Sequence, residues 1–256
     1  MKSFIAFFQK EIVEGIRCSK TLILGFLFIL LGIMNPAIAK LTPWLIEILG
    51  DSLAENGMII TEVKVDALTS WTQFFKNIPM GLIAFVLIYS NTFTKEYESN
   101  TLVIILTKGL KRYKVLLAKL LNMLLLWTVL FFICFIITYI YNDYFWDNSI
   151  ANNLVFAVLC WWLFGIFVIS LLVLMSTIFK NNSSVLLTTA SFILIFYLLG
   201  LIPKLIYFTP TTLMSGYSML VSNIVINEYL KTIIITILFS IINIILSVPI
   251  FNKKQL

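Results

Sequence analysis

Six stretches of roughly 20 apolar residues constrain this chain more than any other feature. A helix needs about 20 apolar residues to cross the hydrocarbon core, and it satisfies its own backbone hydrogen bonds there. The stretches are Thr21–Ala39, Ile78–Phe93, Val115–Ile140, Leu154–Phe179, Val185–Tyr207 and Lys231–Phe251. The sequence therefore predicts an all-α membrane protein with about six transmembrane helices, in a single transmembrane domain over residues 1–256. We expect the second helix to begin earlier than its stretch, near Trp71.

The composition supports this class and argues against an enzyme. The chain is 61% hydrophobic and 12% charged, whereas soluble domains are nearer half apolar and a quarter charged. It has no histidine, which is the commonest general base and metal ligand. Its three cysteines show no metal or redox spacing. We therefore expect no catalytic site, no metal and no cofactor in this chain, which disfavours an intramembrane enzyme.

The distribution of Lys and Arg predicts the orientation. With both termini cytoplasmic, the inner side holds 13 of the 18 basic residues but only four of the 12 acidic ones. Cytoplasmic loops carry such an excess. The net charge of +6 then reflects topology rather than nucleic-acid binding. The Ile-, Lys- and Asn-rich usage is typical of a low-GC bacterium. We expect a multi-pass protein of the bacterial cell (plasma) membrane, in contact with membrane lipid.

Residues 1–20 show the pattern of an amphipathic helix. One arc holds Phe4, Ile5, Phe8, Ile12 and Ile16. The opposite arc holds Lys10, Glu11, Glu14 and Arg17, with Phe7 as the one apolar residue that does not fit. Such a helix lies in the membrane interface instead of crossing it. The segment is predicted to be an interfacial helix ahead of the first span.

Three segments between the spans are more than simple turns. Residues 40–76 are expected to form an outer loop, partly helical, whose carboxylates are solvated. Residues 208–229 are apolar for a loop, which favours an outer re-entrant segment of short helices before the last span. In the cytoplasmic loop 94–114, Ser99 or Asn100 can begin a short helix and Gly109 can end it. That apolar helix is too short to span, so it docks on headgroups or on a protein.

The same cytoplasmic loop carries a resemblance to a known family. The run Glu96-Tyr97-Glu98-Ser99-Asn100-Thr101-Leu102 is followed by Lys111-Arg112-Tyr113-Lys114-Val115-Leu116-Leu117-Ala118-Lys119-Leu120. Together they resemble the signature of the type 2 ATP-binding-cassette (ABC) exporter permeases, and the plan of the spans agrees along the whole chain. Asn100 and Ala118 stand where that family usually has glycine.

The resemblance implies partners and a candidate coupling site. Such a permease is half of a transmembrane dimer, completed by a second copy or a homologous permease. ABC ATPase subunits on separate chains bind ATP and Mg and supply the energy. The loop 94–114 contacts the ATPase, with the candidate coupling residues Glu96, Glu98, Thr101, Leu102 and Ile105. The alternative is a loop that merely caps two spans.

The interior of the spans bears on the cargo. No span has a charged residue near its middle, which disfavours the alternative function, an ion- or proton-coupled secondary transporter. It favours a hydrophobic or amphipathic cargo, such as a peptide, a drug or a lipid-like molecule, which the resemblance to exporter permeases implies is moved outward. One face of the sixth span holds the polar residues Thr232, Thr236, Ser240, Asn243 and Ser247. These residues, Thr236, Ser240 and Asn243 above all, together with Asn35 in the first span, either pack helices together or line the cargo path.

Overall fold

The structure is a computed structural model that describes residues 2–54, 65–98, 107, 110–221 and 226–254. All regular structure in these ranges is helical. The α-helices are α1 (Lys2–Arg17), α2 (Lys20–Ala54), α3 (Ala67–Tyr89), α4 (Asn91–Glu98), α6 (Arg112–Phe145), α7 (Leu154–Ile178), α8 (Asn182–Gly200), α9 (Gly216–Val221) and α10 (Ile226–Lys253). Three short 3-10 helices are η1 (Asn148–Ile150), η2 (Ile206–Phe208) and η3 (Pro210–Met214).

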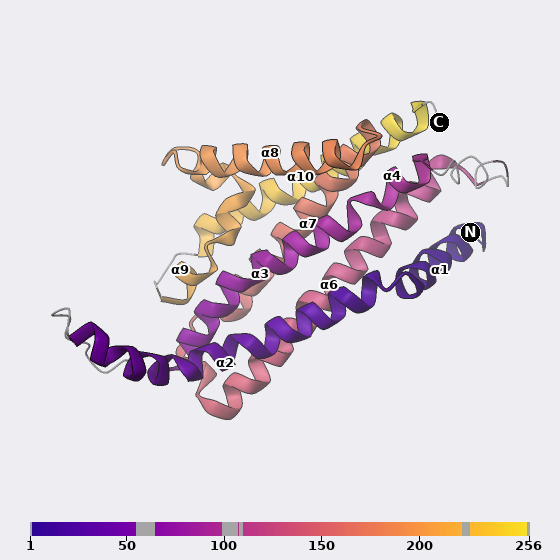
Figure 1. Cartoon of the computed structure of the whole chain (residues 1–256). Helices are drawn as coiled ribbons and strands as arrows, with labels where there is room; N and C mark the ends of the chain where they lie inside the picture. The colour runs from indigo at the N-terminus through magenta and orange to yellow at the C-terminus, as the bar shows by residue number, and fades with distance from the viewer. Residues whose placement is uncertain (1, 55–64, 99–106, 108–109, 222–225, 255–256) are drawn as a thin grey trace.

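The prediction of six membrane-spanning helices is confirmed. The helices long and apolar enough to cross a membrane are α2, α3 with its continuation α4, α6, α7, α8 and α10. Figure 1 shows them as an elongated bundle with both chain termini at one end, which we call the terminal end. Helix α4 lies at this end, and α9 lies at the opposite, distal end.

The ends of several helices differ from the sequence prediction. Much of the predicted outer loop 40–76 is helical, since α2 continues through Pro43 to Ala54 and α3 begins at Ala67. The Asp66 side chain caps α3 by accepting a hydrogen bond from the Thr69 backbone N–H at 2.9 Å. The earlier start of this span, near Trp71, is therefore correct. Helix α8 ends at Gly200, short of the predicted Tyr207, because Pro203 disfavours a helical residue before it.

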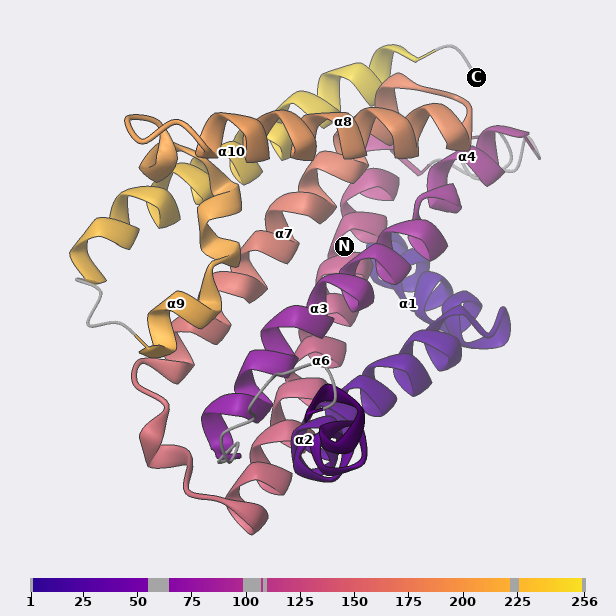
Figure 2. The same ribbon diagram turned by 60° about the vertical axis from the view of Figure 1, so that its left-hand side comes forward.

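The bundle contains two groups of helices. Helices α1, α2, α3 and α6 pack mainly with one another and form the N-terminal group, while α7, α8, α9 and α10 form the C-terminal group. Figure 2 shows α8 and α10 on one side of α7, with α2, α3 and α6 on the other. The segment before α10 folds back as η3 and α9 against α7. Its re-entry into a bilayer stays a prediction.

Aromatic contacts hold the two groups together at α6 and α7. A Cβ at Gly165 would lie 2.2 Å from the Trp127 ring, so only glycine allows this close approach. The Trp127 indole N–H donates to the Trp162 carbonyl at 3.2 Å, and the Trp162 indole N–H donates to the Thr128 hydroxyl at 3.1 Å. These contacts fix the middle of α6 against α7.

Candidate functional site

Helix α4 follows α3 after a single residue, Ser90, and carries the first part of the predicted coupling loop. It lies at the terminal end (Figure 1), where its residues Phe93, Thr94 and Glu96 are buried. Tyr97 is partly buried and packs against the core. Consecutive helical residues point about 100° apart, so Glu96 and Tyr97 contact different neighbours.

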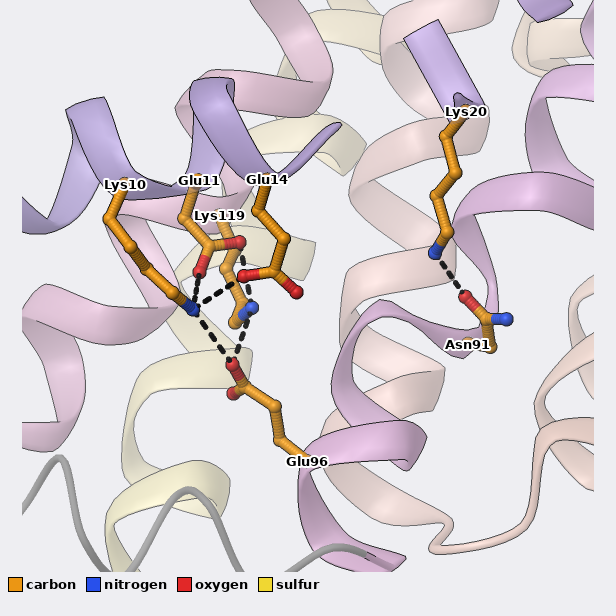
Figure 3. A network of polar contacts seen from close by, with 7 residues as sticks. All are labelled: Lys10, Glu11, Glu14, Lys20, Asn91, Glu96 and Lys119. Atoms are coloured by element: carbon orange, nitrogen blue, oxygen red, sulfur yellow. Dashed lines mark hydrogen bonds and ion pairs between the residues drawn. The ribbon is translucent and has the colours of Figure 1, made fainter. Parts of the chain in front are cut away.

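Lys119 joins three helices at this end of the bundle. Its side chain is only 3% exposed, and its ammonium Nζ lies 2.8 Å from Glu11 Oε2 and 2.9 Å from Glu96 Oε1 (Figure 3). Glu11 comes from α1, Glu96 from α4 and Lys119 from α6. A buried charge is tolerated when opposite charges and hydrogen bonds compensate it. This arrangement provides both for Lys119.

Lys10 extends the cluster toward the surface. Its ammonium lies 2.6 Å from Glu14 Oε2, 3.1 Å from Glu11 Oε1 and 3.9 Å from Glu96 Oε1. Burial works to lower the pKa of Lys10, but contacts with Glu14 and Glu11 outweigh it and raise the pKa to about 12. We call Lys10, Glu11, Glu14, Glu96 and Lys119 the charged network.

Two aromatic rings lie beside the ammonium group of Lys119. The Lys119 ammonium lies 5.8 Å from the ring centroids of both Phe7 and Phe93, a distance at which a cation attracts the ring face. Phe7, which did not fit the amphipathic pattern, is thus buried beside the charges.

The rotation of helix α1 about its own axis therefore differs from the one that the simplest interpretation of its sequence predicts. Its protein-facing side is Phe7, Glu11 and Gly15, whereas Ile5 and Ile16 are exposed. The arc that sequence reasoning assigned as the charged surface is in part a protein contact. The interfacial position of the helix stays a prediction.

A small polar cavity of about 50 Å³ adjoins the network. Glu96 Oε2 and Thr92 Oγ1 are buried beside it without a hydrogen-bond partner among the described residues. Ordered water usually satisfies buried polar atoms of this kind. On the same side, the Lys20 ammonium donates to Asn91 Oδ1 at 2.7 Å and links α2 to α4 (Figure 3).

The structure places only part of the predicted coupling site. Glu96 belongs to the charged network. Glu98 ends α4, and its side chain lies outside the described residues. So do Thr101, Leu102, Ile105 and, except for Thr107, the predicted helix Asn100–Lys108. Sequence reasoning missed that Lys119 pairs with Glu96 and also with Glu11. The available signals were a lysine inside an otherwise apolar run and its place in the family signature, neither of which assigned it to the coupling site.

Among the predicted path or packing residues, Asn35 makes contacts between helices. Its Nδ2 donates to the Thr138 hydroxyl at 3.3 Å, and its Oδ1 accepts from Asn77 Nδ2 at 2.9 Å. The Thr138 hydroxyl in turn donates to the Gly32 carbonyl at 3.0 Å. These bonds tie α2, α3 and α6 together.

The polar face of α10 is turned toward α7 and is largely satisfied by its own helix. The Thr236 and Ser240 hydroxyls donate to carbonyls four residues earlier, at 2.7 and 2.8 Å. Asn243 Nδ2 donates across to the Ser170 hydroxyl of α7 at 3.1 Å. This geometry is typical of helix packing.

An apolar groove of about 390 Å³ lies where the two groups meet. It is bounded by α3, α7, α8 and η3, with Ile83, Phe164 and Leu187 among its lining. None of the four predicted path residues, all of which the structure describes, lines this groove. Within the described ranges, no group of three His, Cys, Asp or Glu side chains is placed to hold a metal ion.

A comparison with known families accounts for this arrangement. The family model described as ABC-2 family transporter protein matches residues 5–218, which include most of α1, all of α4 and the start of α6. No curated protein matches the chain. ABC-2 permeases are membrane subunits, typically not catalytic themselves, that work with an ABC ATPase subunit. Because the match covers most of its length, the chain belongs to the ABC-2 family of transporter proteins, as a membrane-spanning permease subunit.

Proposed function

We propose that this permease moves a hydrophobic or amphipathic cargo outward, powered by separate ATPase subunits that bind ATP and Mg. The observation that carries the proposal is the charged network, which connects the start of loop 94–114 to α1 and α6. A force applied to this loop by an ATPase reaches α4 first. Through Glu96 and Lys119 it then reaches the long helix α6.

The buried ion pairs make this connection stiff. Removing one partner of a buried pair typically costs about 3–5 kcal/mol, because the other charge is left without compensation. Separating α4 from α6 would expose Lys119 and Glu96 to a similar penalty. The network therefore favours movement of α1, α4 and the start of α6 as one unit.

The orientation of the permease in the membrane follows from its charge distribution and from the side on which the ATPase binds. Both termini lie at the terminal end (Figure 1), and the excess of Lys and Arg on that side favours the cytoplasm. The ATP-binding partner needs access to the same side. We therefore place the terminal end, with α4, in the cytoplasm of a cell whose plasma membrane holds the other helices.

The groove between α3, α7 and α8 supports an apolar cargo. Its lining is almost entirely hydrophobic, as expected of a site for apolar ligands. The polar residues Asn35 and Asn243 are engaged in bonds between helices, so we assign them to packing. A secondary transporter usually holds a charged group near the middle of a span, facing the bundle interior. The sequence has none there, which disfavours that function.

A second permease copy or a homologous permease would complete the groove. Helix α8 spans the bundle, yet only its residues Val185 and Thr189 are buried. Leu187, which lines the groove, is 68% exposed. We propose that the partner permease covers this side of α8 in the assembled transporter.

Co-expression with candidate ABC ATPases tests the proposed function. We expect the wild-type permease to co-purify with one of them and to stimulate its ATP hydrolysis in proteoliposomes. Leu102→Asp should weaken both while the permease still inserts. Leu201→Asp, at an exposed residue of the distal end, is the matched control and should change neither. A chain that binds no ABC ATPase and moves cargo in response to a proton gradient would instead be a secondary transporter.

A further inference from the structure

Helix α4 has a second set of contacts, which point away from the charged network. The Tyr97 hydroxyl donates to the Ser176 carbonyl of α7 at 3.3 Å. The Tyr97 ring also lies 6.5 Å from the ring of Phe251 in α10, and Phe93 packs edge-on against Phe251 at 5.9 Å. Tyr97 thus faces the C-terminal group, whereas its neighbour Glu96 faces the N-terminal group.

Lys254 completes these contacts just beyond the end of α10. Its ammonium lies 4.1 Å from the centroid of the Tyr97 ring, which is a cation–π contact. The same ammonium donates to the Phe179 carbonyl at 2.8 Å and to the Ser176 carbonyl at 3.4 Å. Helices leave their last carbonyls unpaired, and a cation there is favourable. One lysine therefore caps α7 and holds Tyr97.

Arg112, the first residue of α6, fixes the chain segment that carries Lys254. Its Nη1 donates to the carbonyls of Phe251 and Asn252 at 3.4 and 3.3 Å, and also to that of Lys254. The C-terminal end of α10 is thus held by the N-terminal end of α6. This places Lys254 where it reaches both α7 and Tyr97.

We propose that Tyr97, Lys254 and Arg112 form a second anchor for α4, so that α4 holds both groups of helices at once. All three are positioning residues, and their part in transport rests on the proposed function. The consequence is specific. Because the apolar groove lies between α3 of one group and α7 and α8 of the other, a helix fixed to both groups couples their separation, and so the width of the groove, to its own position. A helix fixed to the N-terminal group alone would only drag that group.

Hydrogen exchange in α4 measures the anchor directly. We would use the full-length permease in lipid nanodiscs, without any ATPase, and follow the amides of Asn91–Glu98. Lys254→Met removes the cation with little change in size, and should speed their exchange by about three- to tenfold, the loss expected for one partly buried cation–π contact. Tyr97→Phe keeps the ring but loses the bond to Ser176, so its effect should be smaller.

Two further variants separate anchoring from a general effect on the chain end. Lys254→Arg keeps a cation with donors and should restore most of the wild-type protection. Lys253→Met makes the same change at the adjacent exposed position and should leave α4 unchanged. Unaltered exchange in Lys254→Met, or an equal effect of Lys253→Met, would overturn the anchor. Because no ATPase is present, failure of the proposed function would leave this result readable.

Discussion

The charged network at the terminal end and the polar face of α10 bury polar groups in different ways. In the network, Lys119 bonds to carboxylates from two other helices, so both of its ion pairs connect separate elements. On α10, Thr236 and Ser240 bond to their own helix, and Asn243 alone among the three reaches α7. A row of hydroxyls on one helix face therefore shows that the face is buried, but not that these hydroxyls bond to a neighbouring helix. The charges hold separate helices together, whereas the Thr236 and Ser240 hydroxyls only allow α10 to approach α7. Thr232, on the same face, differs because its hydroxyl donates to the Tyr207 carbonyl at 2.9 Å.

The largest expected effect is at the network. Lys119→Met leaves Glu11 and Glu96 buried without their shared cation, and should lower the free energy of unfolding by about 3–5 kcal/mol. Thermal or denaturant unfolding in detergent measures it. Lys111→Met, at an exposed position on the same helix end, is the control and should stay within about 0.5 kcal/mol of wild type. Equal stabilities of the two variants would show that the charged network does not stabilise the fold.

Asn35 should have an intermediate effect, because its bonds connect α2, α3 and α6 without carrying charge. Asn35→Leu removes one bond and leaves Asn77 without its acceptor. We expect a loss of about 1–2 kcal/mol of unfolding free energy, with ATP hydrolysis by the assembled complex unchanged. A loss of coupling at full stability would instead assign Asn35 to the cargo path.

On α10, Asn243 and Thr236 should differ from each other. Asn243→Leu breaks the bond to Ser170 and should cost about 0.6–1.7 kcal/mol, the range for such bonds in membrane proteins. Thr236→Val only removes a bond within the helix, and should cost less than about 0.5 kcal/mol. A double-mutant cycle of Asn243→Leu with Ser170→Ala measures the coupling. Normal stability with altered transport in Asn243→Leu would mean that this face contacts cargo.

The smallest effect concerns pH and Lys254. Burial, aided by the charge of Lys180, lowers the pKa of Lys254 to about 8 from 10.5. The unfolded chain therefore binds more protons between these two values, and the contribution of this group to stability rises as pH rises through that window. Other groups facing it are Arg112 and Tyr97. Since Lys254 is only half-buried, we expect less than about 1 kcal/mol. Comparing wild type with Lys254→Met at pH 7, 8, 9 and 10 measures it, and parallel curves would contradict the shift.

Much of the fold was predictable, because spans depend on local composition. The apolar runs gave the six helices, and the Pro203 signal for the end of α8 was present but not used. The rotation of α1 about its own axis was not predictable from local composition. A period of 3.6 residues assigns Phe7 and Glu11 to a face, but it does not say whether water or protein covers that face. The partner of Glu11, Lys119, lies 108 residues away in the sequence.

The candidate site was predictable only in part, for a related reason. The resemblance identified Glu96 through its motif, but the motif treats Tyr97 as a variable position between two acids. Its contacts depend on Lys254, beyond the last span, and on carbonyls at the end of α7. Such contacts form only when the chain brings distant helix ends together, and no local pattern encodes them.

A distance measurement on the assembled complex tests most directly whether the network transmits the action of the ATPase to the helices. Ile150 of η1 and Val221 of α9 are exposed residues at the distal end. Because η1 contacts α3 and α6 while α9 belongs to the C-terminal group, spin labels at these two positions would report on both groups. Cys18, the exposed native cysteine, is first changed to serine. With ATP, the distance distribution should shift in the wild-type complex, and the shift should be largely lost in Glu96→Gln, which keeps the size of the side chain but not its charge. An equal ATP-dependent shift in both complexes would show that the network does not transmit the action of the ATPase.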